Sequence, residues 1–425
     1  MNAAFRTQEW VRQAAVYEVN IRQYTPEGSF RAFAGSLNRL RDMGVSVLWF
    51  MPIHPIGVQN RIGSLGSYYS IRNHCDTNPE FGSLDDFRYL VGAAKEAGMR
   101  VVLDWVANHT AWDHVWTRSH PEFYVRDAEG RFQSPYDWSD VIQLDHQRID
   151  QQDAMLEAMR FWVKEFDIDG FRCDMAHLVP LAFWYRARRE LDAIKPLFWL
   201  AETEEPGYHQ VFDASYTWEF LHRMESYWRG QAGMAGLQEV LDRYDRLFPA
   251  DAIRLFFTSN HDENSHSGSE YERMGDAALA FAVLCATWKG IPLVYSGQEL
   301  PLRSRLDFYH KDRIPWTDPP ALQDFYRRLL ALRQEHPALR AGDPAVSTRR
   351  IASSADQQVF AFLRQAGSRA LLVVLHLNGE GPRQVTLQDR DLNGIFTEVF
   401  TGQVLDMGRN QQVQLPAWGY AVFST

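Results

Sequence analysis

GFRCDMAH, residues 170–177, is the stretch that decides the fold of this chain. Arg172 and Asp174 stand two positions apart in it, and in a β-strand such residues point to the same side. A guanidinium beside a carboxylate favours the ionised acid, which is the form that a carboxylate nucleophile requires. Taken alone, the octet also fits an ordinary ion pair at a strand end, so its meaning depends on the segments around it.

Three other segments combine an apolar run with polar residues at its end. They are RVVLDWVANH (residues 100–109), LFWLAE (197–202) and IRLFFTSNHDEN (253–264). Their polar ends carry carboxylates and imidazoles, namely Asp104, His109, Glu202, His261 and Asp262. Such a run is typical of a buried parallel strand that opens onto a polar edge.

Strand-like and helix-like runs alternate from near the N-terminus to about residue 336. The strand-like runs cover residues 16–21, 45–50, 100–106, 168–173, 197–201, 211–214, 253–257 and 293–295. Helix-like runs between them include residues 84–97, 153–165, 275–289 and 322–336. Eight alternating units predict a closed (β/α)₈ barrel, an α/β fold whose active sites lie at the C-terminal ends of the strands. The sixth run is short and has no clear apolar core.

Two regions depart from this alternation and set the predicted domain boundaries. Residues 110–145 are rich in aromatic, charged and turn residues, and their DAEG sequence predicts a hairpin turn. We read them as an inserted subdomain that walls the site. The first part of the barrel is then residues 1–109 and the second part residues 146–341. Residues 342–425 contain short strand-like runs without a long helix, which predicts a C-terminal β-sandwich domain.

Composition narrows the class of protein. The chain has 425 residues, 45% of them hydrophobic, and a net charge of −10, which disfavours nucleic acid as a partner. No apolar run is long enough to span a membrane. Residues 1–15 lack a signal core, which favours a cytoplasmic location, although a secreted protein trimmed of its signal has the same appearance. Cys75, Cys173 and Cys285 are odd in number and scattered, as reduced thiols are. Oligomeric state is left open by the sequence.

The four segments resemble the four signature regions of the α-amylase family of glycoside hydrolases, in the family's order and at compatible spacing. Flanking segments are similar to family motifs as well: GVSVLWFMPIHPIG (residues 44–57), NPEFGSLDDF (78–87) and GIPLVYSGQE (290–299). The resemblance covers essentially the whole chain, including the inserted segment and the β domain. It implies an oligosaccharide or polysaccharide substrate, most simply α-1,4-linked glucans derived from starch.

The resemblance implies a retaining mechanism through a covalent glycosyl-enzyme. Asp174 corresponds to the nucleophile, Glu202 to the general acid/base and Asp262 to the third carboxylate, which binds sugar hydroxyls and stabilises the transition state. Retention requires the two reacting carboxyl groups to lie about 5–5.5 Å apart. We therefore expect Asp174 to stay ionised beside Arg172, and Glu202 to hold a proton near neutral pH.

A supporting shell of substrate-binding residues carries over by position. It consists of Arg172, His109, His261, Tyr69 and Asp104, with Asp104 matching an aspartate that is usually structural. Tyr69 matches the tyrosine that stacks under the sugar, although its neighbour Tyr68 could take that role. Among the tryptophans, Trp112 and Trp138 are the candidates for walls of the site, because most others are expected in the core.

The resemblance also raises the possibility of a structural Ca²⁺, while the chemistry itself implies no cofactor. The matching positions are Asn108, Asp145 and the backbone carbonyl of His177. Calcium takes about six to eight oxygen ligands, and these positions supply only three. Asn108 fits the capping of a turn equally well.

Departures from the family pattern leave the reaction open. Starch-cleaving members often have a Lys-His pair after the nucleophile, where this chain has Ala176 and His177. The short insert favours an open cleft and linear glucans. A transglycosylase or sugar isomerase acting on maltooligosaccharides, sucrose or trehalose would share the first half-reaction. A non-catalytic relative is disfavoured, because all three carboxylates are present.

Overall fold

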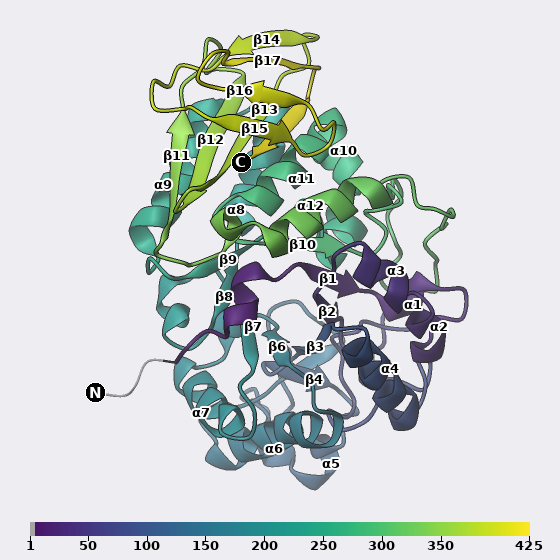
Figure 1. The fold of residues 1–425 in the computed structure, drawn as a ribbon. Coiled ribbons are helices and arrows are strands. Elements are labelled where there is room, and N and C mark those ends of the chain that lie inside the picture. The colour runs from purple at the N-terminus through teal and green to yellow at the C-terminus, as the bar shows by residue number, and fades with distance from the viewer. Residues whose placement is uncertain (1–4) are drawn as a thin grey trace.

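The computed structural model describes residues 5–425 and contains a closed barrel of eight parallel strands (Figure 1). The strands are β1 (Val16–Val19), β2 (Val47–Phe50), β3 (Arg100–Trp105), β6 (Gly170–Cys173), β7 (Phe198–Ala201), β8 (Ala214–Tyr216), β9 (Ile253–Phe256) and β10 (Ile291–Tyr295). β1 pairs with both β2 and β10, which closes the ring. The predicted barrel fold is confirmed.

Seven of the strands lie where the sequence predicted them, and the sixth is displaced. Residues 211–214 were expected to form it, but β8 begins only at Ala214. The apolar Val211 and Phe212 precede the strand as buried packing residues. Asp213, which follows them, accepts hydrogen bonds from Arg188 and from the Trp199 backbone N–H, so this segment caps the neighbouring strand instead of extending the sheet.

Helices surround the barrel, and the longer ones present an apolar stripe to it, as amphipathic helices do. Their bounds are α1 (Ile21–Tyr24), α2 (Phe30–Ala34), α3 (Leu37–Asp42), α4 (Leu84–Glu96), α6 (Ile149–Phe166), α7 (Leu181–Asp192), α8 (Trp218–Trp228), α9 (Met234–Leu247), α10 (Glu270–Met274), α11 (Ala278–Thr287) and α12 (Gln323–Glu335). Ser83 and Asp86 form a capping box that begins α4. Helix α11 is almost wholly buried, because it lies between the barrel and the C-terminal sheets (Figure 1).

The inserted segment follows β3. Its two short strands, β4 (His109–Ala111) and β5 (Val141–Gln143), pair antiparallel, and α5 (Trp116–Ser119) lies between them. The predicted DAEG turn is present, because Gly130 has a φ of 78° and the Gly130 N–H donates to Asp127 O.

The C-terminal region is antiparallel, as predicted. One sheet contains β11 (Val346–Ile351), β12 (Val359–Ala366), β13 (Arg369–His376), β18 (Tyr420–Ser424), β15 (Ile395–Glu398) and β16 (Val404–Asp406), and a second pairs β14 (Arg383–Thr386) with β17 (Gln412–Leu415). Alternate residues of β12 face opposite ways. Phe360 and Phe362 join the barrel core beside Trp288, whereas Ala361 and Leu363 join a separate core between the two sheets.

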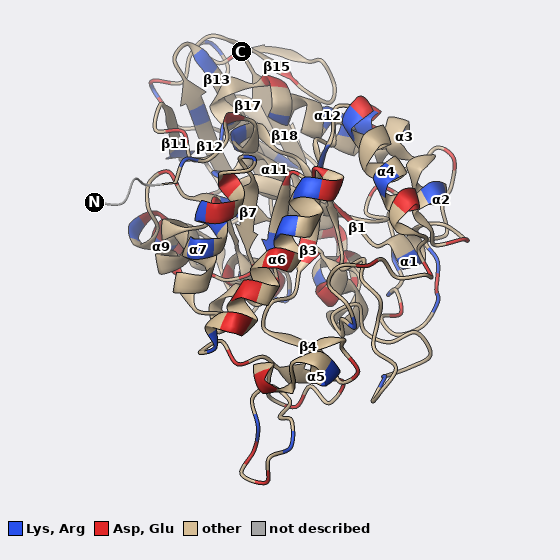
Figure 2. Cartoon of the chain, turned by 90° about the horizontal axis from the view of Figure 1, so that it is seen from below, with Lys and Arg blue, Asp and Glu red and all other residues tan. Residues whose placement is uncertain are grey.

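Acidic and basic residues are mixed along the outer helices, as α6 shows in Figure 2. Within residues 5–425, no helix combines the length and the apolar character needed to cross a bilayer. The barrel strands end at one mouth, where Asp174, Glu202 and Asp262 follow β6, β7 and β9.

Candidate active site

Arg172 is the hub of the barrel mouth. Its side chain is fully buried, its Nη1 donates to Asp104 Oδ1 at 2.9 Å and to Asp174 Oδ1 at 3.0 Å, and its Nη2 lies 2.9 Å from Glu202 Oε1. Its Nε donates to the Tyr216 hydroxyl. A planar guanidinium offers donors in fixed directions, so one side chain sets the positions of three carboxylates.

Glu202 is also held by the backbone that follows the nucleophile position. The Met175 N–H donates to Glu202 Oε2 at 2.8 Å. Met175 has a φ of 41°, a left-handed conformation that is uncommon for a residue other than glycine. This turn directs the N–H toward Glu202 and brings the two reacting carboxyl groups together.

Arg172 favours the ionised form of Asp174, as expected, but burial opposes this effect. Burial raises the pKa of Asp174 well above its usual value, the nearby Glu202 carboxylate adds to the rise, and Arg172 only partly offsets it. The sequence pattern showed the cation but not the second carboxylate on the same guanidinium. Burial and the Glu202 carboxylate therefore both favour the protonated form of Asp174, and Arg172 favours the ionised form.

Asp262 and His261 form an ion pair in which the charged forms of both side chains are favoured. Their side chains approach to 3.3 Å, and His261 Nδ1 lies 2.5 Å from the carboxylate of Glu18 on β1. Although burial acts to lower it, Asp262 and Glu18 raise the pKa of His261 well above its usual value. Although burial acts to raise it, His261 lowers the pKa of Asp262 to about 2. Asp262 therefore favours the ionised carboxylate, and His261 favours the protonated imidazolium.

Tyr69, not Tyr68, faces the site. The Tyr69 hydroxyl lies 2.7 Å from His261 Nε2 and 3.0 Å from Asp104 Oδ2, whereas Tyr68 is buried and donates to Asn20. The pKa of His109 is shifted in the opposite direction from that of His261, because burial lowers it to about 3. It is a neutral imidazole, suited to hydrogen bonds with hydroxyl groups.

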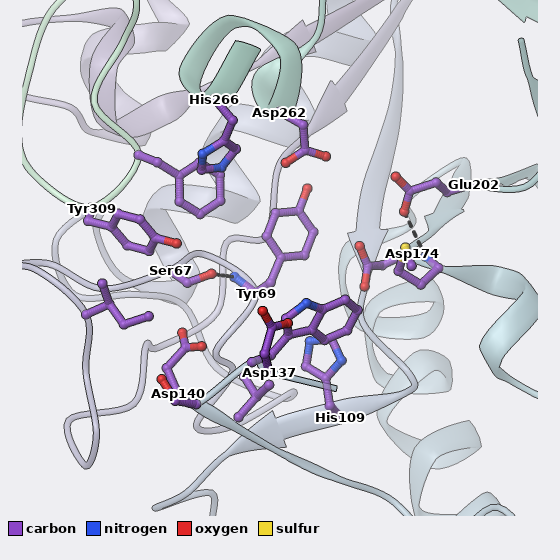
Figure 3. A pocket seen from close by; sticks show the side chains of 16 residues that line it. Ser67, Tyr69, His109, Asp137, Asp140, Asp174, Glu202, Asp262, His266 and Tyr309 are labelled. Carbon is purple, nitrogen blue, oxygen red and sulfur yellow. Dashed lines mark hydrogen bonds between the residues drawn. The ribbon is translucent and has the colours of Figure 1, made fainter. Parts of the chain in front are cut away.

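Asp174, Glu202, Asp262, Tyr69 and His109 line a cavity of about 420 Å³. Figure 3 shows Glu202 and Asp174 at one end, Tyr69 at the centre, and Ser67, Tyr309 and Asp140 at the other end. Other lining residues include His109, Asp137, Trp138, Asp262, His266 and Phe308. A concave site with convergent polar groups and perturbed acids is typical of an enzyme's binding site.

Four predicted substrate-binding residues do not line this cavity. Arg172, Asp104 and His261 lie just beneath its surface and hold the residues that do. Trp112 is also outside the lining, and its indole N–H donates to Ser139 O. It therefore braces the loop that carries Trp138, which does line the cavity. Substrate contact by Trp112 stays a prediction.

Sequence reasoning missed several residues of the site. Glu18 is fully buried behind His261, and the signal for it was an acidic residue inside the apolar strand VYEVN. Phe308 and Tyr309 lie in a segment without regular structure, where no pattern marked them. The Met175 backbone contact depends on a dihedral angle, which the sequence does not show.

The predicted calcium ligands gain little support. Asn108 Oδ1 is buried without a hydrogen-bond partner, as a ligand atom could be. The His177 carbonyl accepts from the Tyr208 hydroxyl, and Asp145 accepts from the Gln147 N–H. In the described part of the chain, no group of three or more His, Cys, Asp and Glu side chains is placed to hold a metal ion. These residues do not form a calcium site by themselves, and calcium stays a prediction.

Comparison with known proteins agrees with this geometry. The family model of the α-amylase catalytic domain matches residues 17–141 and 127–312. The chain belongs to the α-amylase family. The maltogenic α-amylase AmyB of Thermotoga neapolitana is 30% identical, with a TM-score of 0.88 over 97% of this chain and 99% of that one.

Two curated relatives of this α-amylase family chain are longer proteins. The α-amylase MalA of Haloarcula japonica is 27% identical over 391 residues, which are 87% of this chain and 56% of that protein. An α-1,4-glucan:maltose-1-phosphate maltosyltransferase of Rhodospirillum rubrum is 28% identical over 86% of this chain and 57% of its own length. The chain thus spans little more than half the length of these two relatives.

Proposed function

We propose that this protein is a retaining glycoside hydrolase that cleaves α-1,4-glucosidic bonds in starch-derived glucans or maltodextrins. The observation that carries the proposal is the shared guanidinium, since Arg172 contacts both Asp174 and Glu202. Two carboxyl groups on one fork are near neighbours, which suits the roughly 5–5.5 Å separation of retaining enzymes better than the wider gap of inverting ones.

The first half-reaction forms a bond between Asp174 and the anomeric carbon. The glycosidic C–O bond breaks, and Glu202 gives its proton to the departing oxygen. For this step Glu202 must carry the proton, as a general acid does. A glycosidic oxygen beside Glu202 accepts that proton as a hydrogen bond, while ionised Asp174 keeps its contact with Arg172, so substrate binding favours the productive arrangement.

In the second half-reaction a water molecule gives a proton to Glu202 and its oxygen bonds to the anomeric carbon, as the bond to Asp174 breaks. The oxocarbenium-like transition states of both steps carry positive charge, and Asp262 is an anion placed to stabilise it. None of these steps needs a cofactor. The names of the similar proteins, which include α-amylases and maltosyltransferases, support an α-glucan as the substrate.

Transglycosylation is the second candidate function, and the similarity of the chain to a maltosyltransferase supports it. A sugar hydroxyl would then replace water in the second half-reaction. The Asp174–Glu202 pair does the same work in both cases, so the acceptor decides between them.

The test is incubation with maltoheptaose, followed by NMR of the anomeric protons, with Glu202→Gln as the matched inactive variant. New reducing ends that appear first as the α anomer, and not in the variant, support the hydrolase. Longer oligosaccharides without a net gain of reducing ends support the transglycosylase. The β anomer as first product, or full activity in Glu202→Gln, would overturn the proposal.

A further inference from the structure

We propose that Arg254, on β9 and outside the lining of the active-site cavity, is a positioning residue for the general acid/base Glu202. It acts through Glu204, two residues after Glu202, and through Tyr216, the hydrogen-bond partner of Arg172. The inference rests on the proposed function of the site. It adds a residue that touches neither the substrate nor the reacting atoms.

The carboxylate of Glu204 does not line the cavity and is held by three other elements of the fold. Its Oε1 accepts from the Tyr244 hydroxyl at 2.6 Å and from Arg254 Nη2 at 3.2 Å. Its Oε2 accepts from the Glu219 N–H at 2.9 Å. These donors come from α9, β9 and the first turn of α8. Because Glu204 stands only two residues beyond Glu202, its anchoring limits how far the backbone that carries the acid/base can move.

The same guanidinium also holds the end of β8. Arg254 Nη2 donates to Tyr216 O, and the Tyr216 N–H donates to Thr203 O at 3.1 Å. The Tyr216 hydroxyl accepts from Arg172 Nε at 3.1 Å, and Arg172 Nη2 lies 2.9 Å from Glu202 Oε1. Arg254 therefore acts on both partners of this last contact, on Glu202 along the chain and on Arg172 across Tyr216.

The surroundings of Arg254 fix its guanidinium but leave part of it unsatisfied. Its Cζ lies 3.7 Å from the ring centre of Phe248 and 4.3 Å from that of Tyr244, and such stacking restricts its movement. Burial lowers the pKa of Arg254 to about 10. Its Nε and Nη1 are buried without a hydrogen-bond partner among residues 5–425, which lowers stability. The hydrogen bonds that its side chain does make, all through Nη2, lead to Glu204 and Tyr216.

Arg254→Met removes both of these contacts together. General acid catalysis contributes about 10²–10⁴-fold to a rate, and a displacement of about 1 Å in an active site can cost about 100-fold. We therefore expect proton transfer from Glu202 to the departing oxygen to slow, while attack by Asp174 changes less. Glu204→Gln is the second variant. It keeps the arginine in place, but its amide cannot accept hydrogen bonds at both ends.

The experiment compares kcat/KM on maltoheptaose with kcat/KM on α-maltosyl fluoride. The first substrate needs a proton on its departing oxygen, whereas fluoride departs with little help from an acid. We expect both variants to lower kcat/KM on maltoheptaose at least about tenfold, and on the fluoride by no more than about threefold. The ratio of the two values reports the position of Glu202 and does not depend on the fraction of enzyme that is folded.

Arg188→Met is the matched control. Arg188 is also buried, lies 2.8 Å from the Asp213 carboxylate just before β8, and stacks 4.7 Å from the ring centre of Phe5. Loss of this arginine, at the opposite end of β8 from Tyr216, should lower the melting temperature and leave the ratio unchanged. A lower ratio in Arg188→Met would overturn the inference, because the ratio would then follow stability.

An equal loss on both substrates, or wild-type ratios in folded Arg254→Met and Glu204→Gln, would also overturn the inference and leave the proposed function standing. No reaction of the unchanged protein with either substrate would overturn the proposed function together with the inference. If Arg254→Met does not fold, the ratio in Glu204→Gln decides alone.

Discussion

Glu18→Gln is the substitution that most sharply tests the electrostatics of the site. The Glu18 carboxylate lies 2.5 Å from His261 Nδ1, and the other nitrogen, Nε2, lies 2.7 Å from the Tyr69 hydroxyl and 3.3 Å from Asp262. Because Tyr69 can donate its single hydrogen to Asp104, both ring nitrogens of His261 are placed to donate. His261 is therefore an imidazolium, and Glu18 is the buried group that keeps it so.

The size of the effect follows from the change of one carboxylate to an amide. A hydrogen bond to a charged group contributes about 1.5–3 kcal/mol and a neutral one about 0.5–1.5 kcal/mol, so the substitution should weaken the hold on the imidazolium by roughly 1–1.5 kcal/mol. Since one pKa unit corresponds to about 1.36 kcal/mol, the pKa of His261 should fall by about one unit.

The assay is the pH dependence of kcat/KM on maltoheptaose, together with the imidazole nitrogen shifts of His261 by NMR. The imidazolium is lost as pH rises through its pKa, so the alkaline limb of the profile should move to lower pH by about one unit. Glu299→Gln is the control, because Glu299 is equally buried but bonds to Tyr17 and Arg39. Superimposable profiles and unchanged nitrogen shifts in Glu18→Gln would refute the role given to Glu18.

Three other outcomes are expected. Arg172→Met leaves buried carboxylates without their cation, so it should lower the free energy of unfolding by roughly 3–5 kcal/mol in a denaturant titration and abolish activity. Near-normal stability would contradict the proposal that Arg172 holds the three carboxylates in place. Burial lowers the pKa of His54 to about 3, of His74 to about 4 and of His114 well below its usual value. Below about pH 6.5 the unfolded chain therefore takes up protons that the folded chain does not, and the free energy of unfolding should fall by up to about 1.4 kcal/mol per histidine per pH unit. In melting experiments, His74→Phe should reduce this dependence on pH. A melting temperature that does not change with pH would contradict the prediction. Dialysis against EDTA should leave kcat unchanged, whereas a chelator-induced loss of melting temperature that Asn108→Ala removes would assign a structural calcium.

Local pattern was enough to predict the barrel and its catalytic mouth. Apolar runs that end in Asp174, Glu202 and Asp262 identify strands whose carboxyl ends meet, because parallel strands in a barrel open on one face. The position of β8 was not readable, since its three residues, Ala-Ser-Tyr, carry less apolar signal than the Val211–Phe212 pair before them.

Properties that depend on distant parts of the chain could not be read from the pattern. The ionisation of Asp174 depends on Glu202, which shares Arg172 with it only after folding. Behind one end of the cavity, Arg22 donates to the backbone carbonyls of Gly66 and Phe308, which are separated by most of the barrel in sequence. Trp112 and Trp138 have similar surroundings in the sequence. Only the folded structure shows that Trp138 lines the cavity, whereas Trp112 donates to the Ser139 carbonyl next to it.

The most direct test of the central claim is to trap the covalent intermediate. Glu202→Gln would be incubated with α-maltosyl fluoride, whose leaving group needs little protonation, and the intact and digested protein would be weighed by mass spectrometry. We predict an added mass of one maltosyl unit on the peptide that contains Asp174, formed as fluoride departs. An adduct on another residue, or hydrolysis to the β anomer without any adduct, would contradict the account.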